Sequence, residues 1–191
     1  MASGDIEIEI KLPLKNADTV RTFLNKNGTS PKSSSQKDTY YNHPGRDFLL
    51  PKHPFEWLRI RETARTASIT YKHYRPDGAE VHDYADEFET KLEKPAQMHK
   101  ILLNLGFREI AVVDKSRDTW EFRDVEVALD DVNGIGQFIE AESLKQFPDP
   151  KEGRRYLFAI VKEIGAECGP EETYGYPYMV LAKKGHKFNR G

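Results

Sequence analysis

The chain has 191 residues, of which 38% are hydrophobic and 31% charged, and its 29 basic and 31 acidic side chains leave a net charge of −2. This length suffices for one domain with its own core, and the near balance of charge argues against a nucleic-acid surface spread over the whole molecule. The single Cys168 excludes an internal disulfide, and the sequence shows no apolar membrane-spanning run or signal segment. We expect a single domain over 1–191, in a cytoplasmic protein that binds no nucleic-acid polymer and no membrane.

The first predicted strand covers residues 5–13, where the letters IEIEIK alternate strictly between isoleucine and charged side chains. A period of two in β-branched residues is typical of a strand. Like charges on one face repel each other, so something has to offset them. Water is the simplest possibility, because charges keep an exposed strand soluble.

Three helices are predicted next, each followed by a glycine in the left-handed conformation. The first begins after Asn16 as its cap and buries Val20, Phe23 and Leu24 before Gly28. The second begins at Pro95, and the third at about Lys151. The inward residues of these two helices are Met98, Ile101, Leu102 and Leu105 before Gly106, and Leu157, Ile160, Val161 and Ile164 before Gly165.

Seven further strands are predicted at 36–42, 56–63, 67–74, 80–91, 110–121, 124–131 and 137–145. Short turns join several of them, which favours antiparallel neighbours. Residues 29–37 are rich in serine and residues 43–55 hold three prolines, so both are expected to be mobile loops. The fold class is therefore α+β, with eight strands that can close into an antiparallel barrel and helices packed on its outside.

Charged residues occupy alternate positions on several predicted strands. The pairs are Glu7 and Glu9, Arg59 and Arg61, Glu87 and Glu89, Lys115 and Arg117, and Glu140 and Glu142. They could be ordinary solvent faces. We favour a polar interior, with Ile6, Ile8, Ile10, Leu58 and Ile60 packed outward against the helices. Carboxylates bind hard divalent cations, and arginine and lysine bind phosphate oxygens.

Aromatic and glycine residues give weaker signals. Trp57 and Trp120 are expected to be outward core residues, and Gly134 and Gly136 to form a turn rather than a phosphate loop, since no helix follows them. Phe48, Leu49 and Leu50 could contact a base or cover a barrel end. The two alternatives remain open at this point.

An ordered set of motifs resembles the CYTH superfamily, the triphosphate tunnel metalloenzymes. IEIEIK resembles its E-x-E-x-K signature, and YYNHPGRDF, LRIRE, ITYK, NLGF, DKSRDTWEF and ALDDVNGIGQFIEAES resemble the class IV adenylyl cyclase branch. The resemblance covers almost the whole chain. It implies a closed eight-stranded antiparallel barrel whose charged tunnel holds a triphosphate and a divalent metal. It also suggests a homodimer.

The resemblance assigns roles to individual residues. The implied Mg²⁺ or Mn²⁺ ligands are Glu7, Glu9, Glu140 and Glu142, and the implied triphosphate-binding residues are Lys11, Arg59, Arg61, Lys72, Lys115, Arg117 and Lys184. The implied catalytic group comprises Glu9, Lys72, Lys115, Asp130 and Glu140, while Glu87 and Glu89 would line the tunnel. Tyr174 and Lys184 belong to a looser match, TYGYPYMVLAKK, which would cover one mouth.

Three functions agree with this reading. The first is a class IV adenylyl cyclase, which converts ATP to cyclic AMP and pyrophosphate. The second is a triphosphatase acting on thiamine triphosphate, inorganic tripolyphosphate or a nucleoside triphosphate. The third is a module that binds nucleotide or polyphosphate without turnover, which the many carboxylates argue against. The charge pattern does not separate the first two.

Overall fold

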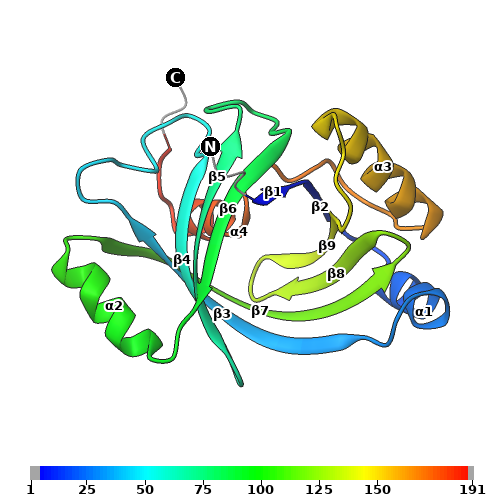
Figure 1. The fold of residues 1–191 in the computed structure, drawn as a ribbon, viewed down its shortest axis with the longest axis horizontal. Coiled ribbons are helices and arrows are strands. Elements are labelled where there is room, and N and C mark those ends of the chain that lie inside the picture. Colours follow the sequence, from blue (N-terminus) through cyan, green and yellow to red (C-terminus); the bar gives the residue numbers. More distant parts are fainter. Residues whose placement is uncertain (1–4, 189–191) are drawn as a thin grey trace. The chain divides into compact units, whose positions relative to one another are not determined.

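The computed structural model describes residues 5–188, which form an α+β fold of strands and four helices (Figure 1). In chain order the elements are β1 (Asp5–Glu7), β2 (Glu9–Pro13), α1 (Ala17–Asn27), β3 (Lys32–Asn42), β4 (Glu56–Thr63), β5 (Ala67–Arg75), β6 (Tyr84–Lys91), α2 (Pro95–Asn104), β7 (Arg108–Phe122), β8 (Val125–Val132), β9 (Gly136–Ser143), α3 (Pro150–Glu163) and α4 (Tyr176–Lys183). None of the helices in this part of the chain combines the length and apolar character needed to cross a membrane.

The strands are hydrogen-bonded in the order β1-β6-β5-β4-β3-β7-β8-β9-β2. The pairs β2–β9, β3–β4, β4–β5, β5–β6, β7–β8 and β8–β9 are all antiparallel, as predicted. The predicted strand 5–13 is divided at Ile8 into β1 and β2, which stand at the two ends of this order. Within residues 5–188 the two end strands are not paired with each other, so the closed barrel is not shown and stays a prediction.

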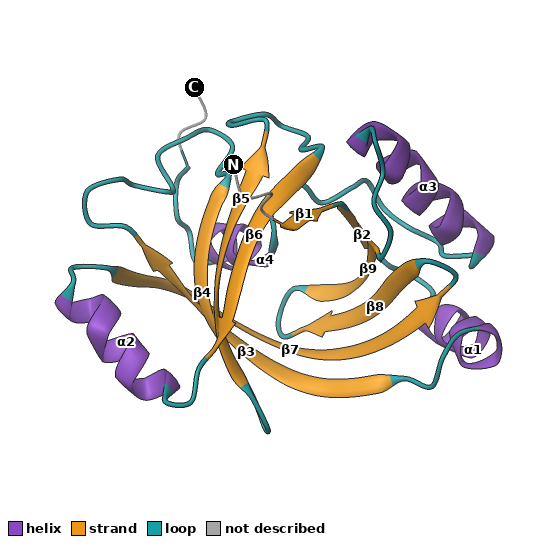
Figure 2. Cartoon of the chain, viewed as in Figure 1, coloured by secondary structure: helices purple, strands orange, loops and turns teal. Residues whose placement is uncertain are grey.

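The chain divides into two compact units. The first unit contains the described residues 5–6, 35–114 and 174–188, and the second contains 7–34 and 115–173. The long strands β3 and β7 contribute residues to both units. Each unit pairs a curved stretch of sheet with at least one helix, drawn as orange arrows and purple coils in Figure 2.

In the first unit, one face of the sheet packs against α2. Leu58 and Ile60 of β4 are buried in a cluster with Tyr41 of β3 and Leu102 of α2. Phe48 joins this cluster, so it covers the core rather than a ligand, whereas Leu50 in the same loop is 61% exposed. Alternate residues of a strand point to opposite faces, so the intervening charged residues of β4 lie on the other face.

In the second unit, the apolar face packs against α1 and α3. Ile8 and Ile10 are buried, and α3 contacts both β2 and β9. Gly153 allows the closest approach, since a Cβ built there would lie 2.8 Å from Cδ1 of Ile8. The inward residues predicted for α3 are all buried, as are Val20 and Leu24 of α1. The outward packing of the isoleucines is thus confirmed for Ile8 and Ile10, whereas the side chain of Ile6 lies outside those described.

Several local predictions are wrong for identifiable reasons. The serine-rich segment predicted as a loop begins β3 at Lys32, because hydrogen bonding to neighbouring strands overrides the weak strand preference of serine. On α2, Ile101 and Leu105 are 50% and 63% exposed, so the apolar stripe is narrower than predicted. Helix α4 was not predicted at all.

The residues at the two ends of α1 also differ from the prediction. Asn16 makes no side-chain cap; its amide instead bonds the carbonyl of Gly165 and the backbone N–H of Glu167. Gly28 has an extended backbone, with φ −99° and ψ −170°, rather than the left-handed one. A Cβ at Gly28 would lie 3.0 Å from the carbonyl oxygen of Leu24 and 3.1 Å from that of Glu121, so close packing requires this glycine. Gly106 and Gly165 do have positive φ, as predicted.

Candidate functional site: two charged sheet faces

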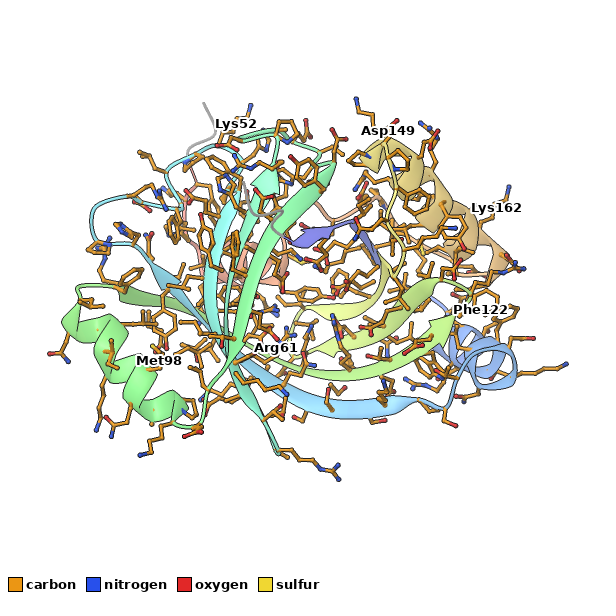
Figure 3. All side chains as sticks on the ribbon, viewed as in Figure 1. Lys52, Arg61, Met98, Phe122, Asp149 and Lys162 are labelled. Atoms are coloured by element: carbon orange, nitrogen blue, oxygen red, sulfur yellow. The ribbon has the colours of Figure 1, made fainter. Side chains whose placement is uncertain are left out.

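The first unit has a charged sheet face opposite the face that packs on α2. Cross-strand register places Tyr40, Arg59, Thr70 and Glu89 in one row across β3 to β6. Neighbouring rows on the same face contain Asp38 with Arg61, and Lys72 with Glu87. Figure 3 labels Arg61 on β4 and Met98 on α2, which belong to the charged face and to the apolar packing, respectively.

Asp38 holds both arginines of β4. Its side chain is 1% exposed and lies directly opposite Arg61, whose Nε and Nη2 donate to its two oxygens at 2.7 and 2.6 Å. Nη1 of Arg59 lies 3.5 Å from Oδ2 of the same carboxylate. Burial would lower the pKa of Arg59, but Asp38 and Tyr40 raise it above its usual range, so the guanidinium stays charged. The predicted pair Arg59 and Arg61 is therefore brought together on one anion.

Lys72 and the two glutamates of β6 share this face. Nζ of Lys72 lies 3.3 Å from Oε2 of Glu87, directly opposite it in the β5–β6 ladder. Oγ1 of Thr70 donates to Oε2 of Glu89 at 2.8 Å. Glu87 and Glu89 thus lie on the same sheet face as Lys72, and Glu87 offsets part of its charge. Their place in a tunnel stays a prediction.

Trp57 lies on the charged face, not among the outward core residues as predicted. It is directly opposite Lys72, and its ring meets that of Tyr40 edge to face at 5.8 Å. The indole Nε1 and the Nε of Arg59 are both buried without a hydrogen-bond acceptor. Such buried donors are costly to leave unpaired, so this part of the face suits an anionic ligand that accepts hydrogen bonds. Trp120 is buried as predicted, and donates to Asn25.

The charged face of the second unit is built around Asp130. Its carboxylate is fully enclosed and lies directly opposite Arg117 of β7, whose Nε and Nη2 donate at 2.6 Å each. Nζ of Lys115 donates to Oδ2 at 2.9 Å. Burial alone would raise the pKa of Asp130, but Arg117 and Lys115 lower it, so the carboxyl group stays ionised. Asp130 thus contacts the cations predicted to bind phosphate.

Glu140 continues this chain of charges to Lys11. Oε1 of Glu140 accepts from Arg117 at 2.8 Å, and its Oε2 lies 3.1 Å from Nζ of Lys11. Lys11 is directly opposite Glu140 in the β2–β9 ladder. Both oxygens of this predicted metal ligand therefore contact cations. The charge of Lys11 in IEIEIK is thus offset by Glu140 of β9, not by water alone.

Four glutamates form the next row of this face. Glu9 of β2 lies directly opposite Glu142 of β9, which in turn lies opposite Glu126 of β8, and Glu126 lies opposite Glu121 of β7. Like charges in cross-strand positions destabilise a sheet unless a cation or a proton offsets them. Burial raises the pKa of Glu126, although Arg117 lowers it, and Glu140 raises it further. Glu7 is the last residue of β1 and precedes this row by two residues.

The donor set in the second unit fits a hard divalent cation. Its oxygen donors are carboxylates, the ligand type that Mg²⁺ and Mn²⁺ favour. Among residues 5–188, no three histidine, cysteine, aspartate or glutamate side chains are gathered closely enough to hold a metal ion by themselves. Mg²⁺ is commonly held by one or two carboxylates together with substrate phosphates. Glu9 and Glu142 provide such a pair, since they are direct cross-strand neighbours.

The predicted mouth residues lie in the C-terminal part of the first unit. Tyr174 stacks between His53, at a centroid distance of 5.5 Å, and Tyr178, at 4.4 Å. Lys184 directly follows α4 and is exposed. The assignment of Lys184 to the triphosphate site stays a prediction.

Asp38 and Glu126 lie on these faces, although no role was predicted for them from the sequence. Asp38 stands in KDTYY, two residues before Tyr40, and a period of two would have placed it on the face of a strand. Its register opposite Arg61 could not be read from the sequence. Glu126 shares a face with Asp130 in VEVALD, but its place in a row of glutamates depends on two further strands.

Comparisons with known proteins show which family the chain resembles. The CYTH domain model matches residues 5–169. "Putative adenylate cyclase MJ0240" of Methanocaldococcus jannaschii is 35% identical over 162 residues, which cover 84% of this chain and 89% of that protein.

Solved structures show the same fold. The PH1819 protein of Pyrococcus horikoshii OT3 has a TM-score of 0.76 and 27% identity, with 94% of this chain and 99% of that chain covered. The "putative adenylyl cyclase HpAC1" of Hippeastrum has a TM-score of 0.61 and 18% identity, with 97% and 98% covered. On the strength of the matched domain and this sequence identity, the chain belongs to the CYTH domain family.

Proposed function

We propose that this protein is a metal-dependent enzyme that acts on a triphosphate, with ATP cyclisation to cyclic AMP and pyrophosphate as the first candidate reaction. One observation carries the proposal: each unit presents a set of arginine and lysine side chains fixed by one buried aspartate. These sets are Arg59 and Arg61 on Asp38, and Lys115 and Arg117 on Asp130. A triphosphate carries about four negative charges, so several preorganised cations are needed to bind it.

Each charged face is proposed to bind phosphate oxygens of a triphosphate, as the resemblance implies. In this proposal Arg59, Arg61 and Lys72 bind phosphate oxygens from one unit, and Lys11, Lys115 and Arg117 bind them from the other. The buried donors on Trp57 and Arg59 support an acceptor-rich ligand. A cytoplasmic location belongs to the same proposal.

A divalent cation, Mg²⁺ or Mn²⁺, would neutralise charge on the phosphate oxygens when bound. Glu9 and Glu142 are proposed to hold it, because they are direct cross-strand neighbours and carboxylate oxygens are the ligands that Mg²⁺ and Mn²⁺ favour. Glu7 and Glu140 remain proposed ligands from the family pattern, although Glu140 would have to share its oxygens with Arg117 and Lys11. The glutamate row argues against a simple anion-binding module, which gains nothing from carboxylates near its ligand.

A triphosphatase is the second candidate. It is supported by the Hippeastrum structure of the same fold, whose title ascribes to that protein a dominant triphosphatase activity. The two reactions require the same cations and differ in which phosphorus is attacked. In cyclisation the ribose 3′-hydroxyl attacks the α-phosphorus and pyrophosphate leaves. In hydrolysis water attacks the terminal phosphorus and the shortened polyphosphate leaves.

Product analysis tests the proposal. The protein is incubated with ATP and Mn²⁺ or Mg²⁺, and with tripolyphosphate and thiamine triphosphate in parallel, and the products are separated. Cyclic AMP with pyrophosphate supports the cyclase, whereas ADP or orthophosphate supports the triphosphatase. The absence of products from all three compounds with either metal contradicts an enzyme of this class.

A further inference from the structure

The contacts of Asp38 do more than balance the charge of its neighbours. It places one enclosed carboxylate between two guanidinium groups, with a two-point contact to Arg61 and a single contact to Arg59. Two such groups repel each other when they are brought close without an anion. The carboxylate therefore fixes both the distance between the arginines and the direction in which their remaining N–H groups point.

The arginines retain donors for a ligand while they are held. Nε of Arg59 is buried and has no acceptor, and the side chains of Arg59 and Arg61 are only 21% and 17% exposed. A free arginine side chain has many rotamers, and ordering it on binding reduces affinity. An arginine that is already ordered avoids this cost, because its planar fork is set before the ligand arrives.

The second unit repeats the arrangement on different strands. Asp130 lies directly opposite Arg117, as Asp38 lies opposite Arg61, and in both cases a second cation stands two residues earlier on the arginine strand. That second cation is Lys115 in one unit and Arg59 in the other. In both units, one buried aspartate contacts two cations that stand two residues apart on the same strand. This recurrence indicates that the aspartate holds the two cations in place.

We propose that Asp38 is a positioning residue, which presets Arg59 and Arg61 for the oxygens of one phosphate group of the triphosphate. The inference rests on the proposed function, and it gives Asp38 a role that acts through the arginines. A different role would be simple neutralisation, in which Asp38 only reduces the positive charge of the face. The two roles make opposite predictions for anion binding.

The opposition follows from the sign of the charge. Asp38→Asn removes a negative charge close to the bound anion, so a neutralising role predicts tighter binding of tripolyphosphate. A positioning role predicts weaker binding, because the neutral amide no longer holds two guanidinium groups in place. Asp38→Glu separates the roles in another way, since it keeps the charge and displaces the carboxylate by one methylene.

The test is calorimetric binding of inorganic tripolyphosphate to the full chain and to three variants. We expect Asp38→Asn and Asp38→Glu each to raise Kd by about tenfold or more, as expected when preorganised charged contacts are lost. Asp86→Asn is the matched control, because Asp86 also accepts from an arginine, Nε of Arg75 at 3.0 Å, but lies on the other face of the sheet. Its Kd should equal that of the wild type.

The binding measurements distinguish a failure of this inference from a failure of the proposed function. If the wild type does not bind tripolyphosphate, the proposed function fails and this inference fails with it. If the wild type binds and Asp38→Asn binds equally or more tightly, only the positioning role is overturned. Circular dichroism and thermal melting check the fold of each variant. Should Asp38→Asn not fold, Asp38→Glu decides, and wild-type affinity in that variant overturns the proposal.

Turnover provides a second readout. The substrate is the one identified by product analysis. A positioning role predicts that Asp38→Glu raises KM for this substrate while the melting temperature changes little. A variant that melts earlier but keeps the wild-type KM and tripolyphosphate Kd would show a role in stability alone.

Discussion

Glu9 lies directly opposite Glu142 in the antiparallel ladder between β2 and β9. Two carboxylates in this position destabilise the sheet by roughly 0.2–1 kcal/mol unless a proton or a cation lies with them. The neighbouring glutamate in the row, Glu126, has a pKa raised by burial. The glutamate row therefore lies at the place where the metal is proposed to bind.

We expect Glu9→Gln to abolish metal-dependent turnover while leaving the fold intact. Without metal, the melting temperature should be unchanged or slightly higher, because the amide removes one of two repelling charges. Turnover with Mg²⁺ or Mn²⁺ and thermal melting in a chelator measure the two effects. Glu62→Gln is the control, since Glu62 is exposed and lies on the face of β4 opposite to that of Arg61. Full activity of Glu9→Gln would remove Glu9 from the proposed metal site.

Arg59→Ala should raise KM for the triphosphate by about tenfold or more, because a fixed charged donor is lost from the site. Its effect on stability should be smaller, since Asp38 keeps its two-point contact with Arg61. Steady-state kinetics and thermal melting are compared with Arg75→Ala, an arginine paired with Asp77 and Asp86. A loss of stability with unchanged KM would show that Arg59 is structural.

Asp130→Asn should destabilise the fold by about 3–5 kcal/mol, because Lys115 and Arg117 would lose the buried carboxylate that contacts both. Asp131→Asn is a matched neighbour on the other face of β8, where the residue is exposed, and should change stability by no more than about 0.5 kcal/mol. Urea unfolding of both variants measures the difference. Equal free energies of unfolding would contradict the anchoring role of Asp130.

The sequence predicted most of the features that repeat along a strand. The alternation of Leu58 and Ile60 with Arg59 and Arg61 was enough to assign opposite faces to them, and the structure confirms both faces of β4. The same holds for Ile8 and Ile10 against Glu9 and Lys11. A period of two is a local property, so it can be read without knowing the partner strand.

Features that depend on register or on tertiary packing could not be predicted. The contact of Asp38 with two arginines requires the alignment of β3 with β4, which no local signal supplies. Helix α4 has only eight residues, a length at which intrinsic preference is weak and packing decides. Trp57 lies on the face opposite to the predicted one, because its strand position matches that of Arg59 and the size of its aromatic ring does not decide the face.

Tyr71 should make stability depend on alkaline pH. Burial and its hydrogen bond to Glu56 at 2.6 Å raise its pKa to about 12 from the ordinary 10.0. The hydroxyl ionises first in the unfolded chain, so the contribution of Tyr71 is complete below about pH 10 and is lost as the pH rises towards 12.

The variant Tyr71→Phe removes this titration. Its free energy of unfolding should therefore fall less steeply than that of the wild type between about pH 10 and 12. Urea unfolding at several pH values in this range gives the two slopes, and ultraviolet absorbance follows tyrosinate formation in the folded protein. Parallel slopes would mean that Tyr71 has the same pKa in both states.

The central claim is that the charged face of each unit binds phosphate oxygens of a triphosphate. Calorimetric titration of tripolyphosphate, with Mg²⁺ present, into the wild type and into Arg59→Ala and Arg117→Ala tests it most directly. We predict that the wild type binds tripolyphosphate and that each substitution weakens binding by about tenfold or more, because each removes a preorganised charged donor. An affinity unchanged by either substitution would contradict the claim.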